Sequence, residues 1–337
     1  MHRRQFLRNG LALGALAAAE FAPWQAVSAF AREVGDFIRG PAVKDHPLQQ
    51  LSPHVWMIYS PDGFPTPENQ GMMCNITFVD TPKGLVVLDS GASVQIGEMA
   101  IRQIKRQFPG KPVVAIVNSH YHGDHFLGNQ AFVEAFGDLP IYAHPGTIAA
   151  IRGLEGNLWR TLMEQWTNQA TLGTQVVAPN QPLAHGQELQ FGGVTLRMHH
   201  YGKAHTPADI CVEIVEDAVT YVGDVAMDRR IANMDDGSYV GTLKCYDALE
   251  QNAASKLWVP GHGKPGPGVL QWNRELFQGI YAPCVAAVEA GEPLEAAKAL
   301  VLKDPRVASR AKETAGFDSN IGKYVSLAYL EAEAAAF

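Results

Sequence analysis

The hexapeptide His120-Tyr121-His122-Gly123-Asp124-His125 is the feature that most constrains what this chain can fold into. It follows the apolar run Val113–Val117, which is typical of a buried strand. On an extended chain the first two histidines point to one side and the tyrosine to the other. The glycine then allows a turn that brings the aspartate and the last histidine to a neighbouring position. Burying these four groups without a cation would leave them poorly compensated, so the hexapeptide predicts two adjoining metal sites.

Three later residues complete a known pattern: His205 in the segment 203–209, Asp224 in the segment 221–224, and His262 in the segment 260–263. With the hexapeptide, their order and spacing resemble the metallo-β-lactamase-fold hydrolase superfamily, over about residues 56–272. The resemblance implies an α/β fold, the four-layer αβ/βα sandwich of that superfamily, with helices after the second sheet.

The resemblance also implies a dinuclear metal site. The first metal's implied ligands are His120, His122 and His205, the second's are Asp124, His125 and His262, and Asp224 is implied to bridge the two ions. Histidine-rich ligands favour Zn²⁺ for both ions, with iron or manganese as alternatives. Asp89, at the end of the apolar run Leu85–Leu88, resembles the buried aspartate that supports the metal-binding loop in this superfamily. A turn-forming aspartate would look the same in sequence.

Two divalent ions held in this way would ionise a shared water at neutral pH. We therefore expect a hydrolase in which a metal-bridging hydroxide attacks an ester, thioester, lactone or related bond of a small-molecule substrate. Asp124 is the expected catalytic residue, because it can orient the nucleophile or move its proton. Asp224 stands where many true β-lactamases have cysteine or serine, which favours relatives of glyoxalase II over antibiotic hydrolysis.

Two other functions remain open. One is a sulfur oxygenase resembling the persulfide dioxygenases, which keep much of the motif but use a single iron. The other is a metal-bearing accessory protein of a quinoprotein dehydrogenase or a sulfur-oxidation system, with a periplasmic redox partner. Residues 230–241 and 259–263 resemble a periplasmic branch of the superfamily, zinc metallohydrolases associated with such gene clusters.

The N-terminus predicts export. Arg3 and Arg4 precede the apolar run Leu11–Ala19, which resembles a twin-arginine signal peptide over residues 1–31 and implies a periplasmic protein. The run is shorter than the roughly 20 apolar residues of a membrane span, so no membrane insertion is expected after signal removal. Residues 32–337 are expected to form one domain. From about residue 273 they continue as packing or oligomer-forming helices, so a homo-oligomer is one expected form.

Composition and the remaining polar residues add smaller expectations. The formal net charge of −7 disfavours nucleic acid as a partner. Residues 60–71 are rich in proline and glycine and form either a substrate lid or a connector. Residues 147–172 are expected to be helical, with aromatic side chains that either fill the core or wall a cleft. Neither His199 nor His200 fits the ligand pattern, and the four cysteines are expected to be mostly buried free thiols.

Overall fold

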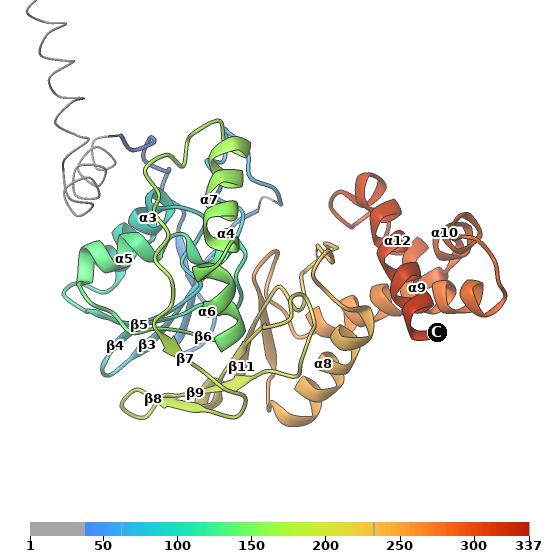
Figure 1. Cartoon of the computed structure of the whole chain (residues 1–337). Helices are drawn as coiled ribbons and strands as arrows, with labels where there is room; N and C mark the ends of the chain where they lie inside the picture. The colour runs from blue at the N-terminus through green and yellow to red at the C-terminus, as the bar shows by residue number, and fades with distance from the viewer. Residues whose placement is uncertain (1–37, 62, 232, 337) are drawn as a thin grey trace, which may run out of the picture. The chain divides into compact units, whose positions relative to one another are not determined.

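Two mixed β-sheets form the centre of the fold in the computed structural model, which describes residues 38–61, 63–231 and 233–336 (Figure 1). All the elements below belong to one compact unit, residues 41–337. The predicted signal peptide, residues 1–31, lies outside the described residues. The first sheet has the strand order β1 (Leu48–Gln50), β2 (Val55–Ile58), β3 (Ile76–Thr81), β4 (Gly84–Leu88), β5 (Val113–Val117), β6 (Ile141–Ala143) and β7 (Gln181–Pro182). Strands β1 to β4 pair antiparallel, whereas β4 to β7 pair parallel.

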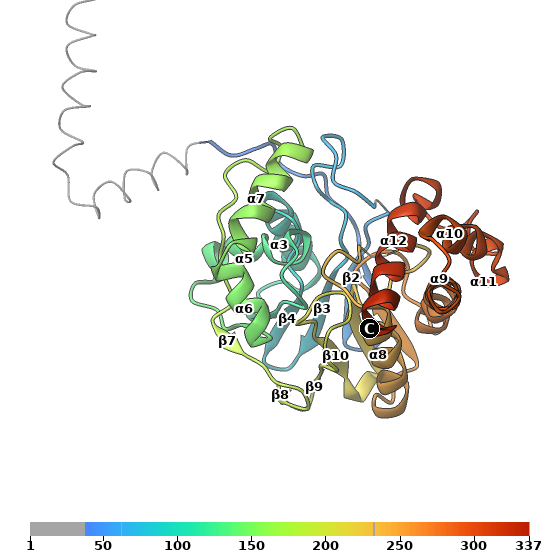
Figure 2. The same ribbon diagram turned by 45° about the vertical axis from the view of Figure 1, so that its right-hand side comes forward.

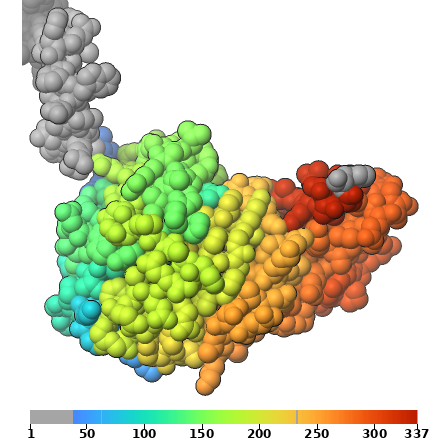
Figure 3. All heavy atoms as spheres, turned by 60° about the horizontal axis from the view of Figure 1, so that its bottom comes forward, coloured from blue at the N-terminus to red at the C-terminus, as the bar shows by residue number. Residues whose placement is uncertain are grey.

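The second sheet is built from the later part of the chain. Its strand order is β12 (Leu257–Pro260), β11 (Val219–Gly223), β10 (Cys211–Ile214), β9 (Thr195–His199) and β8 (Glu188–Gln190). The short 3-10 helix η1 (Val215–Asp217) connects β10 to β11. Within this sheet β11 and β12 pair parallel, and the other neighbouring strands pair antiparallel. The edge hairpin β8–β9 lies on the face that Figure 3 brings forward, and the outer strand β8 is largely exposed there.

Apolar side chains between and outside the sheets create four layers. Val86 and Val117 of the first sheet pack with Met198 and Val212 of the second in one buried cluster. Helices α3 (Val94–Gln107) and α5 (Asn129–Phe136) cover the outer face of the first sheet, and α8 (Tyr239–Asn252) and α9 (Val269–Glu289) cover that of the second. The strand runs are continuously apolar because both of their faces are covered. The predicted four-layer fold is thus confirmed.

The prediction of a single helix over residues 147–172 is wrong. The structure has two helices, α6 (Pro145–Arg152) and α7 (Glu155–Trp166), separated at Gly153. The amide of Gly153 closes α6 on the carbonyls of Ala149 and Ala150. Beyond α7 the backbone takes positive φ at Asn168 and Gln169, which ends the helix there.

The C-terminal residues form helices, as expected. Helices α9, α10 (Leu294–Lys303), α11 (Pro305–Ala308) and α12 (Phe317–Ala336) surround a core of their own that includes Phe277, Val301 and Val325 (Figure 2). Among the described residues, no helix is both long enough and apolar enough to cross a membrane. All four cysteines are buried free thiols, in agreement with the sequence prediction.

Candidate metal centre

The hexapeptide lies where the chain leaves the first sheet after β5. His122 is extended and immediately precedes the short helix α4 (Gly123–Phe126). Gly123 packs so closely on α7 that a β-carbon at this position would lie 2.8 Å from Cβ of Trp159. A larger residue would push the turn away from α7, so glycine is required where the chain turns toward the site.

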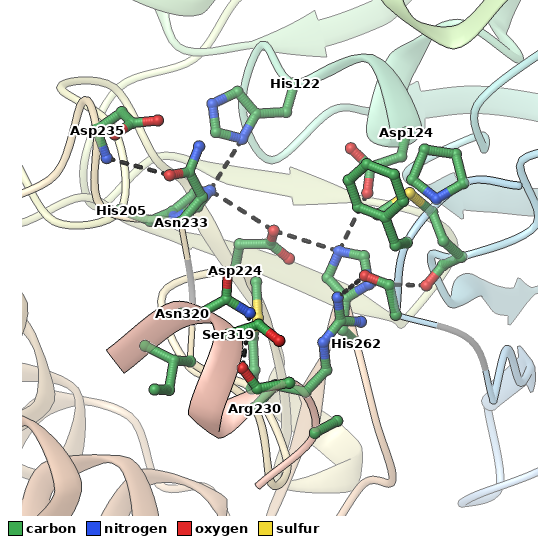
Figure 4. A pocket seen from close by; sticks show the side chains of 18 of the residues that line it. His122, Asp124, His205, Asp224, Arg230, Asn233, Asp235, His262, Ser319 and Asn320 are labelled. Carbon is green, nitrogen blue, oxygen red and sulfur yellow. Dashed lines mark hydrogen bonds and ion pairs between the residues drawn. The ribbon is translucent and has the colours of Figure 1, made fainter. Parts of the chain in front are cut away.

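Four of the predicted ligands form one buried cluster: His120, His122, His205 and Asp224. Their ligand-type atoms all lie within 4.8 Å of one another. Nε2 of His205 lies 3.0 Å from Nδ1 of His122 (Figure 4). Two imidazole nitrogens this close either share one proton or face a common cation. His205 comes from the loop between β9 and β10, so the cluster joins residues from both sheets.

The other predicted ligands form a second buried cluster, Asp124, His125 and His262. Oδ2 of Asp124 lies 3.1 Å from Nε2 of His262 and 3.3 Å from Nε2 of His125. His262 follows the end of β12, and its Nδ1 lies 2.7 Å from the carbonyl oxygen of Met73. That hydrogen bond turns Nε2 of His262 toward the cluster.

Asp224 lies between the two clusters, just after the end of β11. Its Oδ2 is 3.3 Å from Nε2 of both His125 and His262 and 3.5 Å from Nε2 of His205. Gly261 leaves room for this carboxylate, since a β-carbon at Gly261 would lie 2.3 Å from Oδ1 of Asp224. One oxygen atom therefore faces both clusters, as a bridging ligand requires.

The donor set fits two divalent cations. Several of its atoms are buried without a hydrogen-bond partner among the described residues: Nε2 of His120, Nε2 of His125, Oδ2 of Asp124 and Oδ1 of Asp224. Unpaired buried groups of this kind cost free energy that a coordinated cation would offset. The nitrogen and oxygen donors suit Zn²⁺ and other divalent transition metals.

At the first cluster, burial and neighbouring charges favour neutral histidines and an ionised aspartate, which are the forms that bind a metal. Burial, reinforced by neighbouring histidines, holds the pKa of His120 well below its usual value and lowers the pKa of His205 to about 3. Burial alone would raise the pKa of Asp224, but His262 and His125 outweigh it and hold that pKa well below the usual range. Neutral imidazoles and an ionised carboxylate are the forms that bind a metal.

The second cluster differs in one respect. Burial alone would lower the pKa of His125, but Cys74, Asp224 and Asp124 raise it well above the usual value. Without a cation, His125 therefore keeps a proton among acidic neighbours. A metal that binds at His125 must displace this proton, so metal binding here is coupled to proton release.

Asp89 supports the loop that carries the hexapeptide. Its Oδ1 accepts from the amide of Ser119 at 2.7 Å, and its Oδ2 lies 2.7 Å from Nδ1 of His125. The same Oδ2 accepts from the hydroxyls of Ser119, at 2.7 Å, and Tyr221, at 2.6 Å. The Ser119 hydroxyl in turn lies 2.9 Å from Nδ1 of His120. One buried carboxylate thus orients two histidines of the site.

The other histidines singled out in the sequence lie outside both clusters. Nε2 of His199 lies 2.9 Å from Oε2 of Glu213, and Nδ1 of His200 lies 2.9 Å from the carbonyl oxygen of Asp209. The ring of His200 stacks on that of His144 at 4.2 Å. These contacts hold the chain near the His205 loop without supplying a donor to either cluster.

Cys74 is a neighbour of the second cluster that sequence reasoning missed. Its Sγ lies 3.5 Å from Nδ1 of His125, and together with Asp89 it forms a third group of metal-competent atoms. That nitrogen is already hydrogen bonded to Asp89, however, and burial raises the pKa of the Cys74 thiol to about 12. The group therefore supports His125 as a hydrogen-bonded cluster.

A cavity of about 660 Å³ opens over the two clusters. Its apolar wall comes from the loop before β3 and from α7: Gly63, Phe64, Pro65, Trp159, Met163 and Trp166. The rings of Phe64 and Trp166 lie 5.2 Å apart, and the ring of Trp159 lies 4.6 Å from that of His122. The loop 60–71 thus contributes to a pocket wall, and two of the α7 aromatics face the cavity.

The opposite wall carries several polar side chains, and sequence reasoning did not predict it. Its polar residues come from the segment after β11 and from the start of α12: Arg230, Asn233, Asp235, Ser319, Asn320 and Lys323 (Figure 4). The same segments add the less polar Met227, Ile231, Ala315 and Tyr324. The helices expected only to pack or to form oligomers therefore also line the cavity. Arg230 donates to the carbonyl oxygen of Gly63, so its guanidinium joins the two walls.

The family follows from comparison with known sequences. The profile of the metallo-beta-lactamase superfamily matches residues 69–299, more than half of the chain. The chain belongs to this superfamily. It has the metallo-beta-lactamase fold, with buried histidine and aspartate clusters that could hold metal ions. Helix α12 lies beyond the residues that match the superfamily profile.

Two curated superfamily relatives are alkylsulfatases. A linear primary-alkylsulfatase from Pseudomonas sp. is 36% identical over 253 residues, which are 63% of this chain and 47% of that protein. An (R)-specific secondary-alkylsulfatase from Pseudomonas sp. is 33% identical over 60 residues, 18% of this chain and 9% of that protein. The chain spans about half the length of the first of these relatives and less of the second.

Solved structures share the metallo-beta-lactamase fold. A metallo-beta-lactamase from Pontibacter korlensis aligns with a TM-score of 0.55 at 21% identity, over 68% of this chain and 98% of that one. A stereoselective inverting sec-alkylsulfatase from Pseudomonas sp. aligns with a TM-score of 0.66 at 19% identity, over 84% of this chain and 50% of that one. At these identities the likeness concerns the fold alone.

Proposed function

We propose that this protein is a metal-dependent hydrolase that cleaves the sulfate monoester of an alcohol. The observation that carries the proposal is the position of Arg230, whose side chain lines the cavity beside Asp224 and His262. The paired N–H groups of an arginine guanidinium match the oxygens of tetrahedral anions, and arginine stays charged at any working pH. The two alkylsulfatases that this chain resembles in sequence support the same substrate class.

The charges of the cavity support an anionic substrate. We propose Asp124, Asp224 and the five clustered histidines as the ligands of two divalent cations, with Zn²⁺ favoured. Two such cations outweigh the two carboxylates, and Arg230 adds a further positive charge. Lys323 contributes little, because its ammonium lies 2.6 Å from Oδ2 of Asp235. A sulfate group therefore suits the region between the clusters and Arg230.

The two walls of the cavity suggest how the substrate lies. Phe64, Trp159 and Trp166 offer an apolar surface for the organic part of the ester. Cations bound at the clusters would lower the pKa of a water toward neutrality and polarise the ester bond. Asp124, whose Oδ2 faces into the second cluster, is proposed to orient that water and to hold its proton.

Other parts of the sequence prediction stay within this proposal. We propose action in the periplasm after twin-arginine export, and the likeness of residues 230–241 to the quinoprotein and sulfur-oxidation branch keeps a redox partner as a candidate. Ester, thioester, lactone and phosphoester substrates are the alternatives within the hydrolase class. Oxygen uptake with a persulfide identifies the oxygenase alternative.

The test compares a sulfate ester with a neutral ester of the same alcohol, using Arg230→Gln and the neighbouring Arg229→Gln as a matched control. Arg229 is exposed, and its ion pair with Glu313 lies at the surface. We expect Arg230→Gln to lower kcat/KM for the sulfate ester by about tenfold or more, mainly through KM, because it removes a charge-assisted contact. The neutral ester should change little, and Arg229→Gln should behave like the unmodified protein.

Two results would overturn the proposal. One is no sulfate release from any alkyl or aryl sulfate by protein with both metals bound. The other is an equal loss for charged and neutral esters in Arg230→Gln, which would make Arg230 a structural residue. Reaction in H₂¹⁸O then identifies the broken bond: label in the sulfate means S–O cleavage, and label in the alcohol means C–O cleavage.

A further inference from the structure

The histidines of the metal centre differ in what their outward nitrogens contact. Nδ1 of His125 is held by Asp89, Nδ1 of His262 by the Met73 carbonyl, and Nδ1 of His120 by the Ser119 hydroxyl. His122 is arranged the other way round, because its Nδ1 faces His205 and its Nε2 points away from the cluster. That Nε2 is buried and has no hydrogen-bond partner among the described residues.

The carboxylate of Asp236 faces this outward nitrogen. Its Oδ2 lies 3.9 Å from Nε2 of His122, longer than a hydrogen bond but within ion-pair range. Burial and the nearby Asp236 carboxylate raise the pKa of Tyr121, the residue before His122. His122 is the largest cause that holds the pKa of Asp236 below its usual value. The side chain of Asp236 is 49% exposed, so it has room to move the remaining distance.

Helix α12 holds the segment that carries Asp236. The amide of Ala315, just before α12, donates to the carbonyl oxygen of Arg229 at 3.0 Å. The hydroxyl of Tyr324 donates to the carbonyl oxygen of Ile231 at 3.0 Å, and the carboxylate of Glu331 accepts from the hydroxyl of Ser238 at 2.6 Å. These contacts fix both ends of the loop against one helix.

The neighbouring acidic residue is held by the same helix. Oδ2 of Asp235 lies 2.6 Å from Nζ of Lys323, which also lies 3.4 Å from Oδ1 of Asn233. Of the two adjacent carboxylates, Asp235 is thus turned toward α12, and Asp236 is turned toward Tyr121 and His122. The ion pair with Lys323 thus accounts for the direction of Asp235.

We infer that Asp236 is the positioning carboxylate of His122, and that α12 holds it there through the Lys323–Asp235 pair. A carboxylate on the outward nitrogen fixes the tautomer and the ring orientation of a metal-bound histidine and makes it a stronger donor. With a metal at Nδ1, Nε2 of His122 must carry the proton, and it can donate that proton to Asp236. The inference rests on the ligand set proposed above.

The test measures metal retention, independently of activity. Protein loaded with two Zn²⁺ ions is titrated with a chromogenic chelator. Asp236→Ala should weaken the binding of one ion by about 10–100-fold, while the other ion stays as tightly bound. Asp236→Asn should keep more affinity than Asp236→Ala, because the amide oxygen still accepts from His122. Asp318→Asn, which removes one charge from an exposed position on α12, is the matched control and should retain both ions.

Two further variants test the link through α12 and the underlying ligand set. Lys323→Met should weaken the same ion by a smaller factor, and its effect should largely vanish when Asp236 is already alanine. Unchanged retention in Asp236→Ala, with an ion lost in His122→Ala, would overturn the inference and leave the ligand set standing. Retention of both ions in His122→Ala would overturn the ligand set and the inference together. An equal drop in the thermal stability of metal-free Asp236→Ala and Asp236→Asn would assign Asp236 a structural role instead.

Discussion

Asp224 contacts both clusters through a single oxygen atom because its carboxylate lies between the ends of β11 and β12. β11 delivers it, and the absence of a side chain at Gly261 after β12 leaves room for it. Its charge lies among the histidines of both clusters, so removing it changes the electrostatic field at both positions. This makes Asp224 the residue whose loss best distinguishes a coupled dinuclear centre from two separate sites.

We expect Asp224→Ala to bind the second metal more weakly and to lose hydrolysis by orders of magnitude while the fold survives. Metal analysis, turnover and circular dichroism of the purified variant check this. His200→Ala is the control, because His200 contacts the Asp209 carbonyl outside both clusters, and it should be mild. Two tightly bound ions and normal turnover in Asp224→Ala would contradict the bridging role.

At the residue scale, the sequence predicted the candidate donors and the supporting Asp89, but not Arg230 or Asp236. The seven donors follow strand ends in a fixed order along the chain, so their order and spacing are enough to mark them as candidate metal ligands. Arg230 and Asp236 lie on a loop whose position depends on contacts with α12, about 90 residues later in the chain. No local sequence pattern marks Arg230 and Asp236, because residue types and spacing within the loop do not show where it will contact α12.

Strands β9 and β10 illustrate what pairing does with buried polar residues. His199 on β9 lies opposite Cys211 on β10, and its Nε2 contacts Glu213 two residues further along, at 2.9 Å. Glu213 is buried and also accepts from Arg197 and from the amide of Ala254. Burial is the largest influence on His199, and it lowers the pKa of His199 despite this carboxylate.

This shift predicts an acid sensitivity. Because the folded pKa of His199 lies below the unfolded value of about 6.5, the unfolded chain takes up a proton first as the pH falls. The stability that neutral His199 contributes is present above pH 6.5 and is lost as the pH falls from there toward the folded pKa. Urea unfolding of metal-free protein should therefore show a larger loss between pH 7.5 and 5.5 for the unmodified chain than for His199→Gln. Equal losses in the two proteins would contradict the argument.

Element prediction succeeded where one physical signal dominated. The continuous apolar run Val113–Val117 is a strand with those same ends, since both of its faces are covered. The helix expected over 147–172 failed because side-chain periodicity does not reveal the close approach at Gly156. A β-carbon there would lie 2.3 Å from the carbonyl oxygen of Ile151, so the absence of a side chain at Gly156 permits the tight turn between α6 and α7.

At the scale of the whole molecule, the metal centre joins the two halves of the fold. The hexapeptide follows a strand of the first sheet, whereas His205, Asp224 and His262 follow strands of the second. Between the sheets, apolar contacts hold the layers together. Cations at the clusters would add cross-links between the sheets at the end of this core, because each cluster takes donors from both of them.

Metal removal should therefore lower the stability of the whole domain. A ligand that binds only the folded state adds about 4 kcal/mol when its free concentration is 1,000 times its Kd. Since 1 kcal/mol shifts Tm by about 2–4 °C in domains of 150–250 residues, chelation should lower Tm by on the order of 10 °C. Scanning calorimetry with and without chelator measures the shift, and adding Zn²⁺ back should restore it while Ca²⁺ should not. His122→Ala should begin with a lower Tm and lose less on chelation, because part of the cross-link is already missing. An unchanged Tm after both ions have been removed would mean that the sheets hold together without the metal centre.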